Sequence, residues 1–126
     1  MKTTLSPVQL ELISEAAHEV NRTYAAFLGD HSHASWADTP EADRAILREG
    51  VLDVAFNEFN PVKAHEAWTA RKRAEGWTYG LTKDPETKTH PCMISYDQLP
   101  FEQQYKDTLF ESTVKNLLDG LWRIPQ

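Results

Sequence analysis

The sequence predicts a mainly α-helical protein: a compact four-helix domain with a short antiparallel β-hairpin between the third and fourth helices. Three observations lead to this fold class. Apolar residues recur every three or four positions over most of the chain, which is the period of an amphipathic helix. X-Pro pairs stand where the periodic segments begin, and proline is favoured in the first helical turn. Between Gly76 and Pro100 the helical period disappears.

The first helix has a start signal and a stop signal. Ser6-Pro7 with Gln9 forms the S-x-x-Q pattern of a capping box. Gly29 is placed to end the helix, because helices commonly finish with a left-handed residue. The apolar face between these signals consists of Leu10, Ile13, Ala17, Val20, Tyr24 and Phe27.

The other three helices are predicted from the remaining X-Pro pairs. Thr39-Pro40 precedes the second helix, and Asn60-Pro61 precedes a third helix that ends at Gly76. Leu99-Pro100 precedes the fourth helix, which we expect to break near Gly120 because glycine is a poor helix former.

The predicted hairpin occupies the segment without helical period. Its two strands are Trp77-Thr78-Tyr79-Gly80 and Cys92-Met93-Ile94-Ser95-Tyr96, which are rich in aromatic or β-branched residues. Between them lies Asp84-Pro85-Glu86-Thr87, whose residues favour turns. We therefore expect one turn to join two antiparallel strands.

Length and composition limit the classes of protein. A chain of 126 residues fits one domain. Its single cysteine, Cys92, excludes an internal disulfide framework and favours a reducing, cytoplasmic location. No segment approaches the ~20 apolar residues of a membrane span, so we expect no membrane association. The net charge of −6 argues against binding to duplex DNA or RNA, which a basic surface favours.

A set of matched positions in the second half of the chain is specific to one family. It reads His65-Glu66-x-Trp68, Lys72, Gly76-Trp77-x-Tyr79-Gly80, Lys83-Asp84, Lys88, His90-Pro91-Cys92, Tyr96, Leu99-Pro100, Gln103, Lys106-Asp107 and Phe110. This pattern resembles the ryanodine-receptor repeat. We predict one such domain over residues 1–126, with its core motif at 65–118 and an N-terminal helical extension at 6–60.

The resemblance implies a helical binding or docking domain. In the eukaryotic calcium-release channels these repeats form peripheral cytoplasmic lobes that are neither the pore nor catalytic. His18-Glu19-Val20-Asn21-Arg22, followed by Gly29-Asp30 and Trp36, is similar to the stand-alone bacterial and phage members. Those members are associated with sensing nucleotide-derived signals, which is an analogy at the level of the fold.

The strongest candidate ligand residues flank the predicted hairpin: Trp77, Tyr79, Lys83, Lys88 and His90. The two aromatic rings could stack on a base or another ring, while the cations meet phosphate. The alternative is structural. The aromatic rings would then pack against the third helix, and the lysines would be solvated.

A second set of candidates shares a face of the first helix. His18, Asn21 and Arg22 have the i, i+3, i+4 spacing that brings side chains together. We expect a pocket between this helix and the hairpin, where the arginine contacts phosphate. The alternative is that Arg22 pairs with an acidic side chain and His18 hydrogen-bonds a buried carbonyl.

The sequence predicts no catalytic, metal-binding or cofactor-binding residues. Cys92 and His90 lack the signature of an activated nucleophile, and a structural cysteine is the better interpretation. Asp30, His31 and His33, together with His18 and Glu19, could supply metal ligands, and the weakest alternative is a metal-dependent hydrolase that uses His18, Glu19 and Asp30. The H-E-x-x-H spacing is absent, however, because position 22 is an arginine, which would repel a cation. We therefore predict a non-enzymatic binding module for a small anionic, nucleotide-derived ligand. The alternative is a protein-interaction or self-association domain, with Trp36 and Trp122 either as exposed anchors or as core residues.

Overall fold

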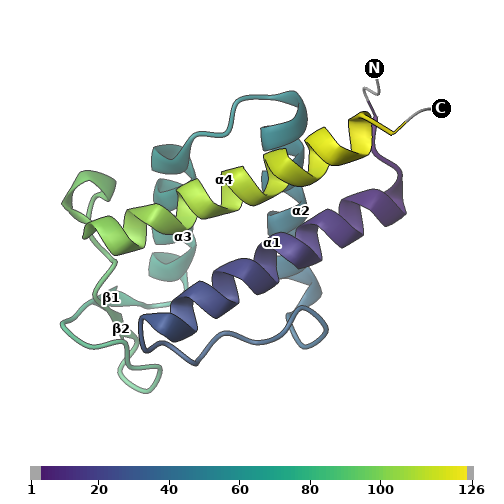
Figure 1. The fold of residues 1–126 in the computed structure, drawn as a ribbon. Helices are drawn as coiled ribbons and strands as arrows, with labels where there is room; N and C mark the ends of the chain where they lie inside the picture. The colour runs from purple at the N-terminus through teal and green to yellow at the C-terminus, as the bar shows by residue number, and fades with distance from the viewer. Residues whose placement is uncertain (1–3, 125–126) are drawn as a thin grey trace. The chain divides into compact units, whose positions relative to one another are not determined.

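The computed structural model describes residues 4–124 and confirms the mainly α-helical fold (Figure 1). Its helices are α1 (Pro7–Phe27), α2 (Glu41–Phe56), α3 (Pro61–Ala74) and α4 (Phe101–Trp122). Two short strands, β1 (Thr78–Tyr79) and β2 (Thr89–His90), and the 3-10 helix η1 (Tyr96–Gln98) lie between α3 and α4. The ends of the predicted 1–126 domain, residues 1–3 and 125–126, lie outside the described residues.

The chain forms two compact units, which are described separately. Of the described residues, unit 1 comprises 4–59 and 106–124, and unit 2 comprises 60–105. Helix α4 therefore contributes its first residues to unit 2 and the rest of its length to unit 1.

Unit 1 is built on an apolar core shared by three helices. Figure 1 shows α1 beside the yellow part of α4, with α2 behind them. The core consists of Ile13, Ala17, Val51, Phe110, Val114 and Leu118. The predicted start of α1 is confirmed, since Ser6 and Gln9 form a complete capping box. Gly29 follows the helix with a φ of 94°, the left-handed conformation that glycine adopts readily.

The loop between α1 and α2 is held by a buried tryptophan. Trp36 is 4% exposed, its backbone N–H donates to Glu19, and its indole N–H donates to Glu11. The guanidinium groups of Arg44 and Arg48 both lie 5.9 Å from the Trp36 ring centroid, a cation–π geometry. Trp36 is thus a core residue of unit 1 and not an exposed anchor.

Unit 2 begins with α3, which Asn60 caps by accepting a hydrogen bond from the Lys63 backbone N–H. The helix ends at Ala74, and Gly76 then reverses the chain with a φ of 93°. His65 hydrogen-bonds the Ile94 carbonyl at 2.7 Å and so ties α3 to the segment before η1. The first turn of α4 is tied to η1 itself, because the Gln104 amide donates to the carbonyls of Tyr96 and Leu99.

The prediction of an antiparallel hairpin is wrong, because β1 and β2 pair in parallel. Thr78 is opposite Thr89 and Tyr79 is opposite His90. The turn-forming segment at Asp84 does reverse the chain, but it joins Asp84 to Thr89 in an isolated antiparallel bridge. A second reversal precedes it, after Gly80, so the chain turns twice between the strands and enters β2 in the same direction as β1.

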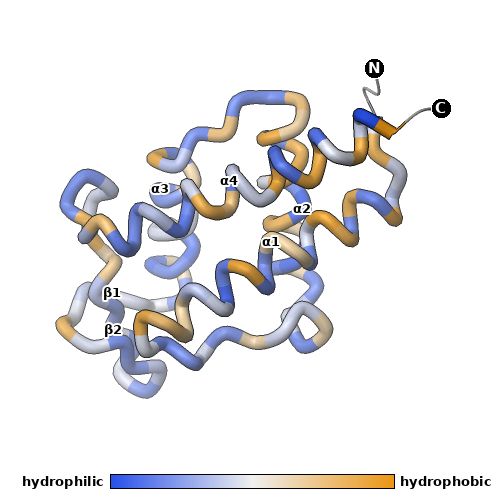
Figure 2. Tube along the Cα trace, viewed as in Figure 1, coloured by the Kyte–Doolittle hydropathy of each residue, from blue (hydrophilic) through white to orange (hydrophobic). Residues whose placement is uncertain are grey.

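Two details of the helix ends also differ from expectation. Helix α4 continues through Gly120 to Trp122 without the predicted break. Pro7 and Pro61 are first helical residues, whereas Pro40 and Pro100 precede their helices by one position. Polar and apolar residues mix along all four helices (Figure 2), and among residues 4–124 no helix combines the length and apolar character needed to cross a membrane.

Candidate functional site

The candidate site is a cleft of about 390 Å³ within unit 2. It lies where the last turn of α3, the glycine turn and β1 meet the segment after β2. Its volume is near the lower end of the ~300–1,000 Å³ typical of small-molecule sites. Its lining consists of Arg73, Gly76, Trp77, Thr78, Tyr79 and Met93.

The end of α3 places Trp77 in this cleft. After the left-handed Gly76, the Trp77 backbone N–H donates to the Lys72 carbonyl at 2.9 Å, which is the hydrogen bond of a helix-ending Schellman motif. The indole therefore lies against the last turn of α3. The Lys72 ammonium is 4.9 Å from the centroid of its ring.

An aromatic cluster supports the cleft from inside unit 2. The His90 ring meets Trp68 edge-on at 5.0 Å between centroids and lies 6.2 Å from Trp77. The backbone N–H of Cys92 donates to Nδ1 of His90 at 3.0 Å, which fixes the imidazole. Met93 is 5% exposed and forms a buried, polarizable wall of the cleft.

The charges of the protein are distributed unevenly between the units. In unit 2, Lys and Arg equal Asp and Glu in number, so the whole net charge of −6 falls on unit 1. The cations of unit 2 are concentrated in the last turn of α3, at Arg71, Lys72 and Arg73. Arg73 lines the cleft and is exposed. The cleft therefore carries a local positive charge on an acidic protein.

Lys88 has a structural role next to the cleft. Its φ is 56°, and its ammonium donates to the Glu75 carbonyl at 2.7 Å. Carbonyls at the end of a helix lack intrahelical partners, so Lys88 caps α3 and is held beside Gly76. Lys83 is half-buried in the loop that leads to Asp84 and does not line the cleft.

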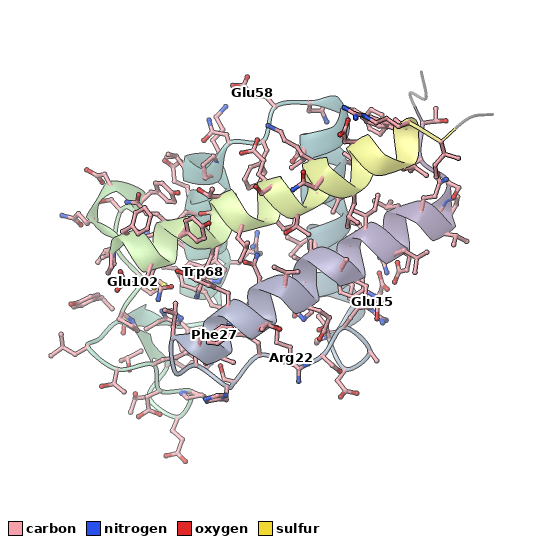
Figure 3. All side chains as sticks on the ribbon, viewed as in Figure 1. Glu15, Arg22, Phe27, Glu58, Trp68 and Glu102 are labelled. Carbon is pink, nitrogen blue, oxygen red and sulfur yellow. The ribbon has the colours of Figure 1, made fainter. Side chains whose placement is uncertain are left out.

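The three candidates on α1 belong to unit 1, where two of them anchor the loop that follows the helix. His18 hydrogen-bonds the Ala34 carbonyl at 2.8 Å, and Arg22 donates to the His33 carbonyl at 3.1 Å. Arg22 also pairs with Glu19 at 2.9 Å. Figure 3 shows Arg22 extending from α1 toward this loop. These contacts match the alternative in which Arg22 pairs with an acidic side chain and His18 hydrogen-bonds a carbonyl, both in structural roles.

Asn21 differs from its two neighbours. Its Oδ1 is buried, and no group among residues 4–124 donates a hydrogen bond to it. An unsatisfied buried acceptor costs about 1–3 kcal/mol.

The eight residues predicted to bind a ligand do not all meet at one site. Of these eight, only Trp77 and Tyr79 line the cleft, and Lys88 and His90 lie close behind it.

Carboxylates of α1 and α2 pair with arginines, and two of them, Glu11 and Glu19, also accept hydrogen bonds from Trp36 of the loop between the helices. The Arg48 guanidinium donates to both Glu11 and Glu41 at 2.7 Å. These hydrogen bonds lower the pKa of both carboxyls below the ordinary value. Desolvation raises the pKa of Glu19, but hydrogen bonds from the Trp36 N–H and Arg22 outweigh it, so that pKa is also lowered.

Unit 1 also has an apolar groove of about 400 Å³ between α1 and α4. Its walls are Glu19, Val20, Thr23, Tyr24, Phe27 and Leu109. Phe27, labelled in Figure 3, is 84% exposed at the end of α1. Among residues 4–124 no cation lines this groove, so its chemistry differs from that of the cleft in unit 2.

A comparison with known protein families shows which residues of the two units match the family that the sequence resembles. The family model of the RyR domain matches residues 53–126, which is more than half of the chain. The chain belongs to the RyR domain family. The RyR match includes all of unit 2 and its cleft, together with α4. It excludes α1 and most of α2, and therefore also His18, Asn21 and Arg22.

Sequence reasoning missed four of the residues that line the RyR cleft: Arg73, Gly76, Thr78 and Met93. It also missed Lys72, whose ammonium stands against the Trp77 ring. A signal for the two cations was present, because only Ala74 and Glu75 separate Arg71-Lys72-Arg73 from the helix-ending Gly76. Cations at the end of a helix lie next to the turn that follows. Met93 could not be assigned, since its position depends on the double reversal of the chain.

Proposed function

We propose that this RyR domain is a non-enzymatic binding module that holds a small anionic, nucleotide-derived ligand in the cleft of unit 2. The observation that carries the proposal is the side-by-side placement of an exposed Arg73 with Trp77 and Tyr79 in one cleft. An arginine can bind a phosphate with two parallel hydrogen bonds. The neighbouring aromatic rings offer surfaces on which a planar group can stack.

The residues proposed to contact the ligand differ from those predicted from the sequence. Arg73, Trp77 and Tyr79 would contact the ligand directly, while His90 and Lys88 keep the surrounding backbone in place through Cys92 and Glu75. His18 and Arg22 remain in the proposal only as residues that stabilise unit 1. Such a domain would act as a sensor or a sponge. A cytoplasmic location and a bacterial or phage origin are proposed on the same resemblance and on the single Cys92.

A second candidate function is protein docking or self-association through the apolar groove of unit 1. The observation that favours it is the 84% exposure of Phe27 beside Val20 and Leu109, because exposed apolar patches often mark interaction sites. Sedimentation at increasing protein concentration tests this function. A mass that rises with concentration and reverts in Phe27→Ser supports it, and a constant monomer mass contradicts it.

The first experiment for the cleft is a thermal-shift screen of anions and nucleotides with the full chain. A ligand at about 100 times its Kd adds about 2.7 kcal/mol of stability. We expect Arg73→Ala to reduce the shift and Lys63→Ala, an exposed cation at the start of α3, to leave it unchanged. A screen in which no anion stabilises the folded wild-type chain contradicts the proposal.

A further inference from the structure

Helix α1 has a second apolar face, which is not part of the core of unit 1. Ile13 and Ala17 are buried in that core, whereas another row of apolar side chains on the helix is exposed: Val8, Leu12, Val20 and Phe27. By helical spacing these four lie within about 120° of the circumference. We call this row the exposed stripe. It includes two walls of the groove, Val20 and Phe27, so the groove is one part of a longer apolar surface.

The exposed stripe has an acidic border. By helical spacing Glu15 and Glu19 lie along one edge of it, and Glu15 is exposed (Figure 3). Arg22 lies near the same edge but is engaged by Glu19 and by the His33 carbonyl. With three glutamates and one arginine, α1 has a formal net charge of −2. A surface that covers the stripe therefore gains from positive charge.

Helix α3 presents a face with complementary features. Only Thr69 among its 14 residues is buried. The side turned away from Thr69 carries small residues that are all exposed: Ala64, Ala67, Ala70 and Ala74. By helical spacing these alanines share an arc of about 120° with Arg71, and we call this arc the alanine face. With four cations and one glutamate, α3 has a formal net charge of +3.

The exposed stripe and the alanine face also match in size. Two helices approach closely when large side chains on one meet small ones on the other, and here the large ones are on α1 and the small ones on α3. The 14 residues of α3 have a length of ~21 Å. The stripe from Leu12 to Phe27 extends over ~22 Å. One helix of this length therefore covers the stripe beside the groove.

Charge distinguishes two ways in which copies of the chain could meet. A groove-to-groove contact brings together two copies of unit 1, each with the net charge of −6. A groove-to-α3 contact brings unit 1 of one copy to unit 2 of another, in which acidic and basic residues are equal in number. Exposed charges farther apart than about 8 Å are largely screened at physiological salt. The local pairing of Glu15 with Arg71 therefore counts for more than the net charges of the two chains.

We infer that the groove and the exposed stripe of unit 1 dock the alanine face of α3 from a second copy of this chain. The two copies contribute different surfaces, so the interface is heterologous and can add further copies in the same direction. The large side chains of α1 pack against alanines, and the acidic border faces Arg71. The inference rests on the second candidate function, self-association through this groove, and names the surface that the groove binds.

The test uses two variants of the full chain, each of which removes one of the two surfaces. Phe27→Ser removes the most exposed side chain of the stripe. Ala67→Glu places a carboxylate at the centre of the alanine face, and α3 is kept because glutamate is a good helix former. We expect each variant alone to weaken self-association in sedimentation by at least about tenfold. An equal mixture should form a heterodimer and no larger species, because each copy keeps the surface that the other lacks.

Matched controls separate the two surfaces from general effects of composition. Phe101→Ser removes another exposed phenylalanine, and Ala45→Glu adds the same charge at an exposed alanine of α2. Both variants should associate like the wild type. Glu15→Arg should weaken association severalfold, and Arg71→Glu in the same chain should restore much of the loss, since residues in contact have non-additive effects.

The outcomes distinguish this inference from the function on which it rests. If the mixture stays monomeric although circular dichroism shows both variants folded, the groove does not bind α3 and the inference is wrong. If Phe27→Ser abolishes self-association and Ala67→Glu does not, the copies meet in another way, and only the inference is overturned. A wild-type chain that is monomeric at every concentration contradicts both.

Discussion

At the scale of single residues, Gly80 lies in close contact with Thr89 of the neighbouring strand. A Cβ atom built on Gly80 would lie 2.5 Å from the Cβ of Thr89. This contact involves an atom next to the backbone and not the end of a flexible side chain. Only glycine at position 80 therefore allows β1 and β2 to pair as they do.

We expect Gly80→Ala to destabilise the protein by about 1–3 kcal/mol, the usual cost of overpacking. Urea unfolding followed by tryptophan fluorescence measures this change. In the double variant Gly80→Ala/Thr89→Gly the obstructing side chain is removed, so the two effects should be non-additive, with a coupling of at least about 0.5 kcal/mol. Additive effects would show that the strands do not approach each other at this point.

The candidate site was predictable residue by residue only in part. Trp77 and Tyr79 were found because aromatic rings beside a helix-ending glycine are visible in the sequence. Lys88 was also singled out, but its role depends on a left-handed backbone and on the Glu75 carbonyl. The sequence offers no sign of that carbonyl, so a capping lysine and a ligand-binding lysine look alike.

At the scale of elements, the helices were predictable because their signals are local. The Ser6 capping box, the Asn60 cap and the glycine stops act within one turn of the helix end. The direction of strand pairing depends instead on two chain reversals. Only the turn at Asp84-Pro85 has a clear sequence signature, so the sequence predicted one reversal and the wrong, antiparallel pairing.

Helix α4 is continuous at a glycine where the sequence predicted a break. It passes through Gly120, whose missing Cβ would meet no atom within 4 Å. We expect Gly120→Ala to stabilise the protein by up to about 1 kcal/mol, because alanine is the better helix former. Fraying near the end of the helix would reduce the gain.

Circular dichroism during thermal unfolding measures this effect of Gly120→Ala. Gly29→Ala is a useful comparison, because there is also no atom within 4 Å but the φ of 94° strains any L side chain. We expect the melting temperature to rise in the first variant and to fall in the second. A fall in both would place the end of α4 in a non-helical conformation.

At the scale of the whole molecule, the pKa values of Glu11, Glu19 and Glu41 are all lowered. A carboxyl with a lower pKa in the folded state than in the unfolded state stabilises the fold at pH above its unfolded value. The ordinary value here is 4.5. The contribution is present above that pH and is lost as the pH falls through the lower, folded values.

We therefore expect the urea midpoint of the wild-type chain to decrease from about pH 7 to about pH 3. Glu11→Gln removes the ion pair with Arg48, so it should lower stability at neutral pH and show a shallower acid dependence. Glu15→Gln is the control, an exposed carboxylate on the same helix (Figure 3). Parallel curves for Glu11→Gln and the wild type would contradict the assigned ion pair.

The division of the chain into units has a consequence for synthesis on the ribosome. Unit 2 is continuous in sequence, from 60 to 105, whereas unit 1 combines 4–59 with 106–124. Its core needs Phe110, Val114 and Leu118, which are translated only after all of unit 2. Unit 2 can therefore close its own contacts early, while the apolar faces of α1 and α2 await their partner. During that interval the growing chain exposes apolar surface, which is the kind of surface that chaperones bind.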